Sequence, residues 1–154
     1  MIKFAKSCRY LACTAILAGL AGCASVTNQS PASIEQSLIA ADKAYDAHNL
    51  QNGYKSASEA FIDFETAFMI EAGEGFLTDE ASIMAERQLD TAPSPVHWGP
   101  IGAMAAASGD LGITWGTFSI DDSTTAGNYV TVWRKVNGEW KIVTDVAVDD
   151  PVAE

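Results

Sequence analysis

The sequence predicts an α+β domain whose helices pack on one face of a strongly bent antiparallel sheet. Two observations support this fold class. In the first half of the chain, apolar residues recur at helical spacing, most clearly over residues 34–48. After residue 96, long stretches rich in β-branched and aromatic residues are separated by Gly and Asn turns. Helices early and a strand meander late are typical of an α+β domain.

The first helix is expected to begin at Ser33, because Ser33 and Gln36 form a capping-box pattern. It should run to about His48, with these apolar residues on one face: Ile34, Leu38, Ala41 and Tyr45. The stretch 49–53 breaks this helix, and a second short helix follows over residues 54–61.

A small hairpin and a third helix are expected next. Residues 66–72 are typical of a strand, Gly73–Gly75 of a turn, and Phe76-Leu77 of a short returning strand. Asp79 can then cap a helix through residues 80–89.

Three or four long strands should complete the domain. The first covers residues 96–108, where Gly99-Pro100 requires a bulge or an edge position. The second covers residues 111–120.

The last two strands form a hairpin over residues 128–146. Asn137-Gly138 predicts a two-residue turn of the primed type, which places Val136 opposite Glu139. Strict alternation would then put one set of side chains on the inner face: Tyr129, Thr131, Trp133, Trp140, Ile142 and Thr144. Asp145 would lie on the outer face.

The N-terminus has the pattern of a lipoprotein signal peptide over residues 1–22. A basic start precedes a short apolar run, and Leu20-Ala21-Gly22-Cys23 resembles a bacterial lipobox. We therefore expect lipidation at Cys23, a flexible tether over residues 23–33, the folded domain over 34–150 and a frayed tail at 151–154. An ordinary signal peptide or a weak membrane anchor are the alternatives.

A lipid anchor would place the domain in the bacterial cell envelope. No aspartate follows Cys23, so by resemblance to sorted lipoproteins we expect the outer membrane, with the domain facing the periplasm and membrane contact through the anchor only. After Cys23, six Lys and Arg stand against twenty Asp and Glu, a net charge of −14. Such a charge disfavours nucleic acid as a partner.

The second half of the chain resembles a known family. The matching pieces are Ser108 to Gly112, Trp115-Gly116, and Tyr129 to Trp133 together with Asn137 to Lys141. They are similar to domain of unknown function 4440, a SnoaL-like family of the nuclear transport factor 2-like (ketosteroid isomerase-like) superfamily. The resemblance implies a cone-shaped, cystatin-like fold, a pocket at the open end of the cone, and a homodimer.

Aromatic residues on the strands suggest that the pocket binds a small apolar or aromatic molecule. The candidate ligand-binding residues are Trp98, Trp115, Tyr129, Thr131 and Trp133. The alternative is that these rings only fill the core beneath the helices.

Acid–base catalysis is a second hypothesis. Asp63, flanked by Phe61 and Phe64, is the candidate carboxylate base, with Tyr129 or Tyr45 as a hydrogen-bond donor. The alternative is a solvated loop carboxylate. The SnoaL resemblance implies a histidine or aspartate near the end of the last strand, but strict alternation turns Thr144 and Val146 inward there.

We expect no metal site and no cofactor. His48 and His97 have no nearby Cys or His partners, and no phosphate loop, dinucleotide fingerprint or nucleophile elbow occurs. The leading hypothesis is thus an envelope lipoprotein that binds a small apolar or aromatic ligand, with no reaction assigned to it. The alternatives are a cofactor-independent isomerase, cyclase or hydratase, and a structural or assembly module of the envelope.

Overall fold

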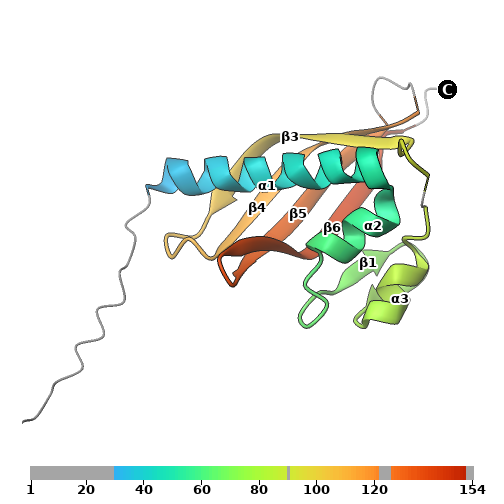
Figure 1. The fold of residues 1–154 in the computed structure, drawn as a ribbon, viewed down its shortest axis with the longest axis horizontal. Helices are drawn as coiled ribbons and strands as arrows, with labels where there is room; N and C mark the ends of the chain where they lie inside the picture. Colours follow the sequence, from blue (N-terminus) through green and yellow to red (C-terminus); the bar gives the residue numbers. More distant parts are fainter. Residues whose placement is uncertain (1–29, 90, 122–125, 152–154) are drawn as a thin grey trace, which may run out of the picture.

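A computed structural model describes residues 30–89, 91–121 and 126–151. The elements occur in the order α1 (Pro31–Asn52), α2 (Tyr54–Phe61), β1 (Met69–Glu71), β2 (Gly75–Leu77), α3 (Glu80–Ala85), β3 (Val96–Ala105), β4 (Leu111–Ile120), β5 (Gly127–Val136) and β6 (Glu139–Asp149) (Figure 1). None of the described helices is long and apolar enough to cross a membrane. The predicted signal peptide, lipobox and most of the tether lie outside the described residues.

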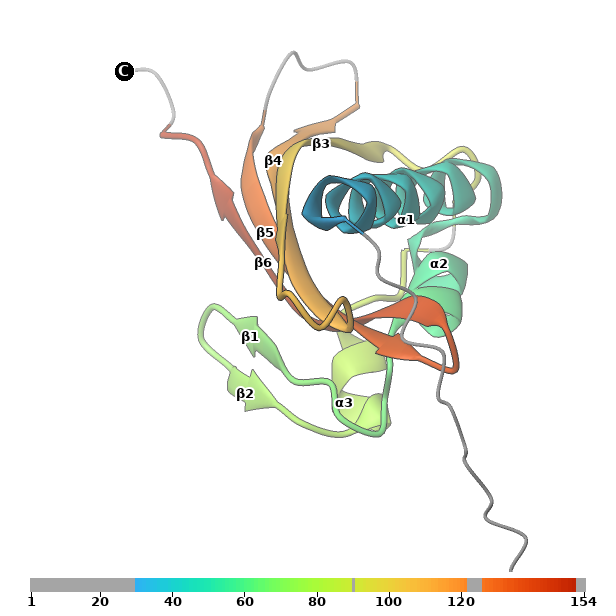
Figure 2. The same ribbon diagram turned by 90° about the vertical axis from the view of Figure 1, so that its left-hand side faces the viewer.

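The four long strands form one antiparallel sheet in the order β3-β4-β5-β6. The sheet bends around α1, which lies in its concave face (Figure 2). The predicted α+β fold class is therefore confirmed. β1 and β2 form a separate two-stranded hairpin, which lies with α3 beyond the end of α2.

The first helix begins earlier than the capping-box pattern predicts. The Ser30 side chain accepts a hydrogen bond from the Ser33 backbone N–H at 3.2 Å, so Ser30 is the N-cap. Pro31 takes the first helical position, where its fixed φ suits a helix and its missing N–H costs nothing. The helix continues past His48 to Asn52 and ends at Gly53, whose φ is 91°.

The two shorter helices agree with the sequence in position. α2 covers Tyr54–Phe61 as expected, and Asp79 caps α3 by accepting from the Ser82 backbone N–H at 3.0 Å. α3 ends at Ala85, however, well before residue 89.

The core lies between α1 and the concave face of the sheet. Its most buried side chains come from every layer: Leu38, Met69, Ile83, Trp133 and Ile142. A bulge between Pro100 and Gly102 confirms the irregularity predicted at Gly99-Pro100.

The final hairpin has the predicted turn but not the predicted register throughout. Asn137 and Gly138 both have positive φ, at 53° and 89°, as a primed turn requires. The pairing runs as expected from Val136–Glu139 to Trp133–Ile142. A bulge at Val143 then shifts every later pair by one residue, so that Thr131 lies opposite Asp145.

This shift changes the face on which Asp145 lies. Strict alternation turns Thr144 and Val146 inward and Asp145 outward. In the structure Asp145 faces the interior beside Thr131, so the predicted outward placement of Asp145 is wrong. A single extra residue causes the change, because side chains alternate with a period of two.

Candidate functional site

A cavity of about 380 Å³ lies between the helices and the concave face of the sheet. α1 and α2 contribute Tyr45 and Tyr54, and the sheet contributes Trp98, Phe118 and Tyr129. The remaining lining includes aliphatic and polar side chains from β1, the end of α3, and the sheet: Ile70, Glu71, Glu86, Arg87, Val96, Ile120, Thr131, Asp145, Val146 and Ala147. The walls are therefore mainly aromatic and aliphatic, with a few polar groups.

Three of the five predicted ligand-binding residues line this cavity. They are Trp98, Tyr129 and Thr131. Trp133 does not reach it: its ring is fully buried in the core, and its indole N–H donates to Thr114 Oγ1 at 2.8 Å.

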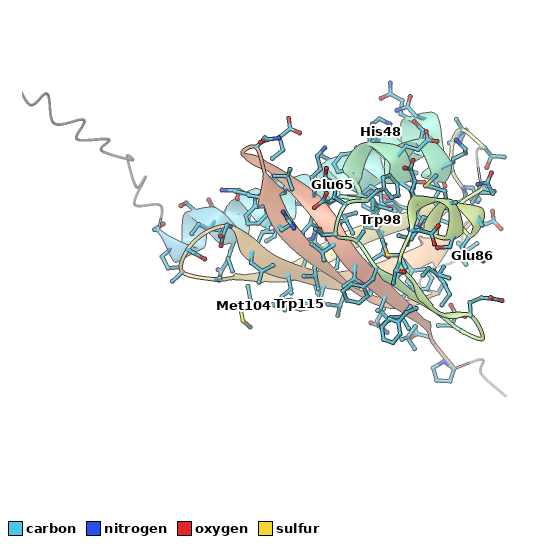
Figure 3. All side chains as sticks on the ribbon, turned by 90° about the horizontal axis from the view of Figure 1, so that it is seen from below. His48, Glu65, Glu86, Trp98, Met104 and Trp115 are labelled. Carbon is cyan, nitrogen blue, oxygen red and sulfur yellow. The ribbon has the colours of Figure 1, made fainter. Side chains whose placement is uncertain are left out.

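Trp115 lies on the opposite face of the sheet. Figure 3 shows Trp115 and Met104 projecting from the face turned away from the helices, whereas Trp98 lies among them. The Trp115 ring crosses Gly102, where an added Cβ would come within 2.2 Å of the ring. Because of this placement, Trp115 is not part of the cavity wall.

The neighbouring Gly116 permits a close approach of other parts of the protein. A Cβ there would come within 2.1 Å of the Gly99 carbonyl oxygen and 2.8 Å of the Tyr129 ring. Protein atoms, namely the β3 backbone and the Tyr129 ring, occupy that space.

Asp63 lies outside the cavity lining. Its carboxylate is 3.3 Å from Arg134 Nε and accepts a hydrogen bond from the Thr66 hydroxyl at 2.7 Å. Its backbone N–H donates to Ile142, and its carbonyl accepts from Thr66 and Ala67, so it anchors the turn after α2. The structure does not bring Asp63 to a place where it could act as a base in the cavity.

Asp42 of α1, fully buried, holds two of the cavity's aromatic walls in place. One carboxylate oxygen accepts from the Trp98 indole N–H at 3.0 Å, and the other accepts from the Tyr129 hydroxyl at 2.9 Å. Burial raises the pKa of Asp42, while hydrogen bonds from Thr114, Tyr129 and Trp98 oppose the shift. A buried carboxylate with these partners fixes the orientation of both rings.

Asp46, one turn later, ties α1 to the same strand. Its carboxylate accepts from the Trp98 backbone N–H at 3.0 Å and lies 2.8 Å from His97 Nδ1. Burial also raises the pKa of Asp46. The two acids together hold the Trp98 side chain and backbone against the helix.

The polar end of the cavity is built on Arg87 and Asp145. Arg87 Nη2 donates to Asp145 Oδ1 at 2.6 Å, and the two side chains are only 4% and 19% exposed. Arg87 Nη1 donates to the Tyr54 hydroxyl, and the guanidinium carbon lies 5.2 Å from the centre of the Tyr54 ring. A charge this buried is stable only because it is paired and hydrogen-bonded.

Two buried polar atoms of the lining residues have no hydrogen-bond partner among the described residues. They are the Tyr45 hydroxyl and Arg87 Nε. Burial raises the pKa of Tyr45 to about 12, so its hydroxyl stays protonated at neutral pH and can donate.

Sequence patterns contain a signal for one of these polar residues. Asp42 follows Leu38 by four residues and so lies on the apolar face of α1. A charge on an apolar helical face indicates a buried polar contact. Asp145 has no such signal, because its position depends on the bulge at Val143.

The described residues contain no group of three or more His, Cys, Asp or Glu side chains arranged to hold a metal ion. Outside the cavity, the Nε2 of His48 pairs with the Ser56 hydroxyl at 3.1 Å. His97 pairs with Asp46.

Comparison with solved structures identifies the fold. A nuclear transport factor 2-like protein of unknown function from Pseudomonas putida KT2440 aligns with a TM-score of 0.58 and 11% identity, over 79% of this chain and 98% of its own. The fold is of the cystatin-like, nuclear transport factor 2-like type.

Two further structures agree. A protein of unknown function with a cystatin-like fold from Nostoc punctiforme aligns with a TM-score of 0.55 and 15% identity, over 75% of this chain and 90% of its own. A protein of the DUF3225 family from Pectobacterium atrosepticum, also of unknown function, aligns with a TM-score of 0.52 and 23% identity. The alignment covers 80% of this chain and 94% of the other. At these identities the likeness concerns the fold alone. No family model matches the sequence, and no curated protein matches it.

Proposed function

We propose that this domain binds a small, flat apolar or aromatic molecule in the cavity between α1 and the sheet. The observation that carries the proposal is the wall itself, in which five aromatic rings surround about 380 Å³: Tyr45, Tyr54, Trp98, Phe118 and Tyr129. Apolar cavities of this size with a few polar groups are typical ligand sites. A purely structural or assembly role would not require this space.

The polar groups favour binding over catalysis. Asp42, the most buried carboxylate, is held by three hydrogen bonds and lies behind the aromatic wall. The Asp145 carboxylate is already engaged by Arg87 through a contact at 2.6 Å.

A pair of variants on β6 tests the proposal. Ala147 lines the cavity and Val148, the next residue, is 64% exposed. Ala147→Trp should fill part of the cavity and weaken the binding of naphthalene-sized probes at least tenfold. Binding is followed by the fluorescence of the probe, excited at a wavelength where tryptophan does not absorb. Val148→Trp places the same ring outside the cavity and should leave affinity within about twofold of the wild type. Equal affinities for both variants would contradict binding in this cavity.

One observation favours a second candidate function, that of a cofactor-independent isomerase, cyclase or hydratase. The bulge at Val143 turns Asp145 into the cavity near the end of the last strand. The resemblance to domain of unknown function 4440 and SnoaL-like proteins implies an acid or histidine in that region. In this second proposed function the base is Asp145 and not Asp63, which the sequence suggested. Deuterium exchange at the α-carbon of a bound ketone would support this catalytic function if Asp145→Asn abolishes the exchange. No exchange in the wild type would exclude proton abstraction from that ketone.

We also propose that the domain is carried on a lipoprotein of the outer membrane, facing the periplasm. The support is the order of basic start, apolar run and lipobox before Cys23. Cys23→Ser should abolish incorporation of a labelled fatty acid in a bacterial host, whereas Cys13→Ser should leave it unchanged. Equal labelling of the wild type and the Cys23→Ser variant would contradict lipidation at Cys23.

We propose that two copies associate through the outer face of the sheet. Ile101 and Met104, which are 71% and 59% exposed, lie on the sheet with Trp115 and Val130. Such apolar residues on a monomer surface are typical of an interface. In sedimentation equilibrium the wild type should be a dimer, and Met104→Glu should be a folded monomer. A monomeric wild type would contradict the proposal.

A further inference from the structure

The charged groups around the cavity narrow the class of ligand further, on the assumption that the proposed binding function holds. Four charged side chains belong to the lining: Glu71, Glu86, Arg87 and Asp145. Arg87 and Asp145 neutralise each other through their contact at 2.6 Å. One positive charge against three negative charges leaves the lining with a net charge of −2 when all four groups are ionised. The surplus comes from Glu71 and Glu86.

Glu71, at the end of β1, is half-buried in this lining. Burial raises the pKa of Glu71, and the neighbouring Asp145 and Glu86 carboxylates raise it further, while the Arg87 guanidinium opposes the shift. Among the described residues, no basic side chain lies within 4 Å of the Glu71 carboxylate. Glu71 therefore carries a partly desolvated negative charge, which a cation in the cavity would stabilise.

The aromatic walls provide a second and independent reason to expect a cation. The face of an aromatic ring is negative, and it attracts a cation that lies within about 6 Å of the ring centre. The cavity already contains one such contact, because the Arg87 guanidinium carbon lies 5.2 Å from the centre of the Tyr54 ring while Arg87 also pairs with Asp145. Trp98 and Tyr129 line the same cavity and offer further ring surface.

An anion of the same shape would be disfavoured at this place. A ligand carboxylate would be repelled by Glu71 and Glu86, and Arg87 is already engaged by Asp145. An uncharged ligand would gain the contact with the rings but would leave the surplus negative charge of the lining unmet. A ligand with both a flat ring system and a positive charge uses both features of the cavity.

We propose that the cavity selects a flat aromatic compound that bears an ammonium group. The ring system lies against Trp98 and Tyr129. The ammonium group lies between Glu71 and Glu86, where β1 and the end of α3 meet the cavity. Arg87 and Asp145 stay paired beside it.

Three naphthalene probes of similar shape test this selection. At pH 7, 1-(2-naphthyl)ethylamine is a cation, 2-acetonaphthone is uncharged and 2-naphthoate is an anion. The wild type should bind the amine about tenfold tighter than the ketone, because contacts of a cation with a desolvated ring face and with carboxylates change affinity by roughly this factor. The carboxylate should bind most weakly. This comparison does not depend on any variant.

A double variant tests the role of the two glutamates. Glu71→Gln with Glu86→Gln should weaken amine binding about tenfold and so remove the preference for the amine. Binding of 2-acetonaphthone should stay within about twofold of the wild type, which also checks that the cavity is intact.

Glu74→Gln with Glu80→Gln is the matched control. Glu74 belongs to the same hairpin and Glu80 to the same helix, and both are exposed and lie outside the lining. This control removes the same charge from the same part of the surface, so it separates a contact in the cavity from the attraction of the whole acidic protein for cations. It should keep the preference for the amine.

The outcomes separate the two proposals. Equal binding of the amine and the ketone, tightest binding of 2-naphthoate, or equal loss of the amine preference in the lining variant and the control would overturn the cation inference and leave the binding function standing. If none of the three probes binds, the proposed function fails and the inference fails with it.

Discussion

Replacing Asp42 with alanine is expected to destabilise the domain by about 3–5 kcal/mol. The side chain is fully buried and accepts hydrogen bonds from the Trp98 indole and the Tyr129 hydroxyl. Without it, these donors and that of Thr114 remain buried with no acceptor, and each such group costs about 1–3 kcal/mol. Burying the Asp42 carboxylate is itself unfavourable, which is why burial raises its pKa. Removing the side chain therefore recovers part of this loss of stability, but not all of it.

Urea denaturation followed by circular dichroism measures this loss directly. Glu59→Ala is the control, since the Glu59 side chain is 50% exposed and pairs with Lys55 on the same helix. It should change stability by about 0.5 kcal/mol or less. If Asp42→Ala costs under about 1 kcal/mol, Asp42 does not hold the aromatic wall.

Replacing Arg87 with methionine is expected to cost about 3–5 kcal/mol, because it leaves the Asp145 carboxylate in the cavity without its partner. Replacing both members, as Arg87→Met with Asp145→Leu, should restore at least about 2 kcal/mol of that loss. A buried ion pair is often no more stabilising than apolar groups of similar volume, so the pair can be removed together at little cost.

A double-mutant cycle that adds Asp145→Leu alone measures the coupling. Strict additivity of the two single changes would contradict a direct interaction between Arg87 and Asp145. The double variant also provides a folded protein with an apolar cavity end.

The repeating patterns of the sequence predict most of the fold. The spacing of Leu38 and Tyr45 predicts α1, and the Asn137-Gly138 turn predicts the final hairpin and its first pairs. These features are local, since they depend on helical periodicity and on the backbone conformation of two residues. Ser30 replaces Ser33 as the cap because Pro31 suits the first helical position.

The site is less predictable because it depends on non-local geometry. Trp98 and Tyr129 line the cavity as predicted from their aromatic character. Trp115 faces away from the helices, and strict alternation within β4 would have shown this once Thr114 was placed inward. Asp145 enters the cavity only through a bulge that no residue pattern indicates.

The placement of the four tryptophans allows a direct test of ligand binding in the cavity. Trp98 lines the cavity, Trp115 lies on the outer face, and the indole N–H groups of Trp133 and Trp140 donate to Thr114 and Ser37. With ¹⁵N-labelled tryptophan, the indole signals report on these places separately. Adding 2-acetonaphthone should shift the Trp98 signal most and leave the Trp115 signal unchanged. A shift confined to Trp115, or no shift at saturating probe, would contradict the proposal that this cavity binds a small aromatic molecule.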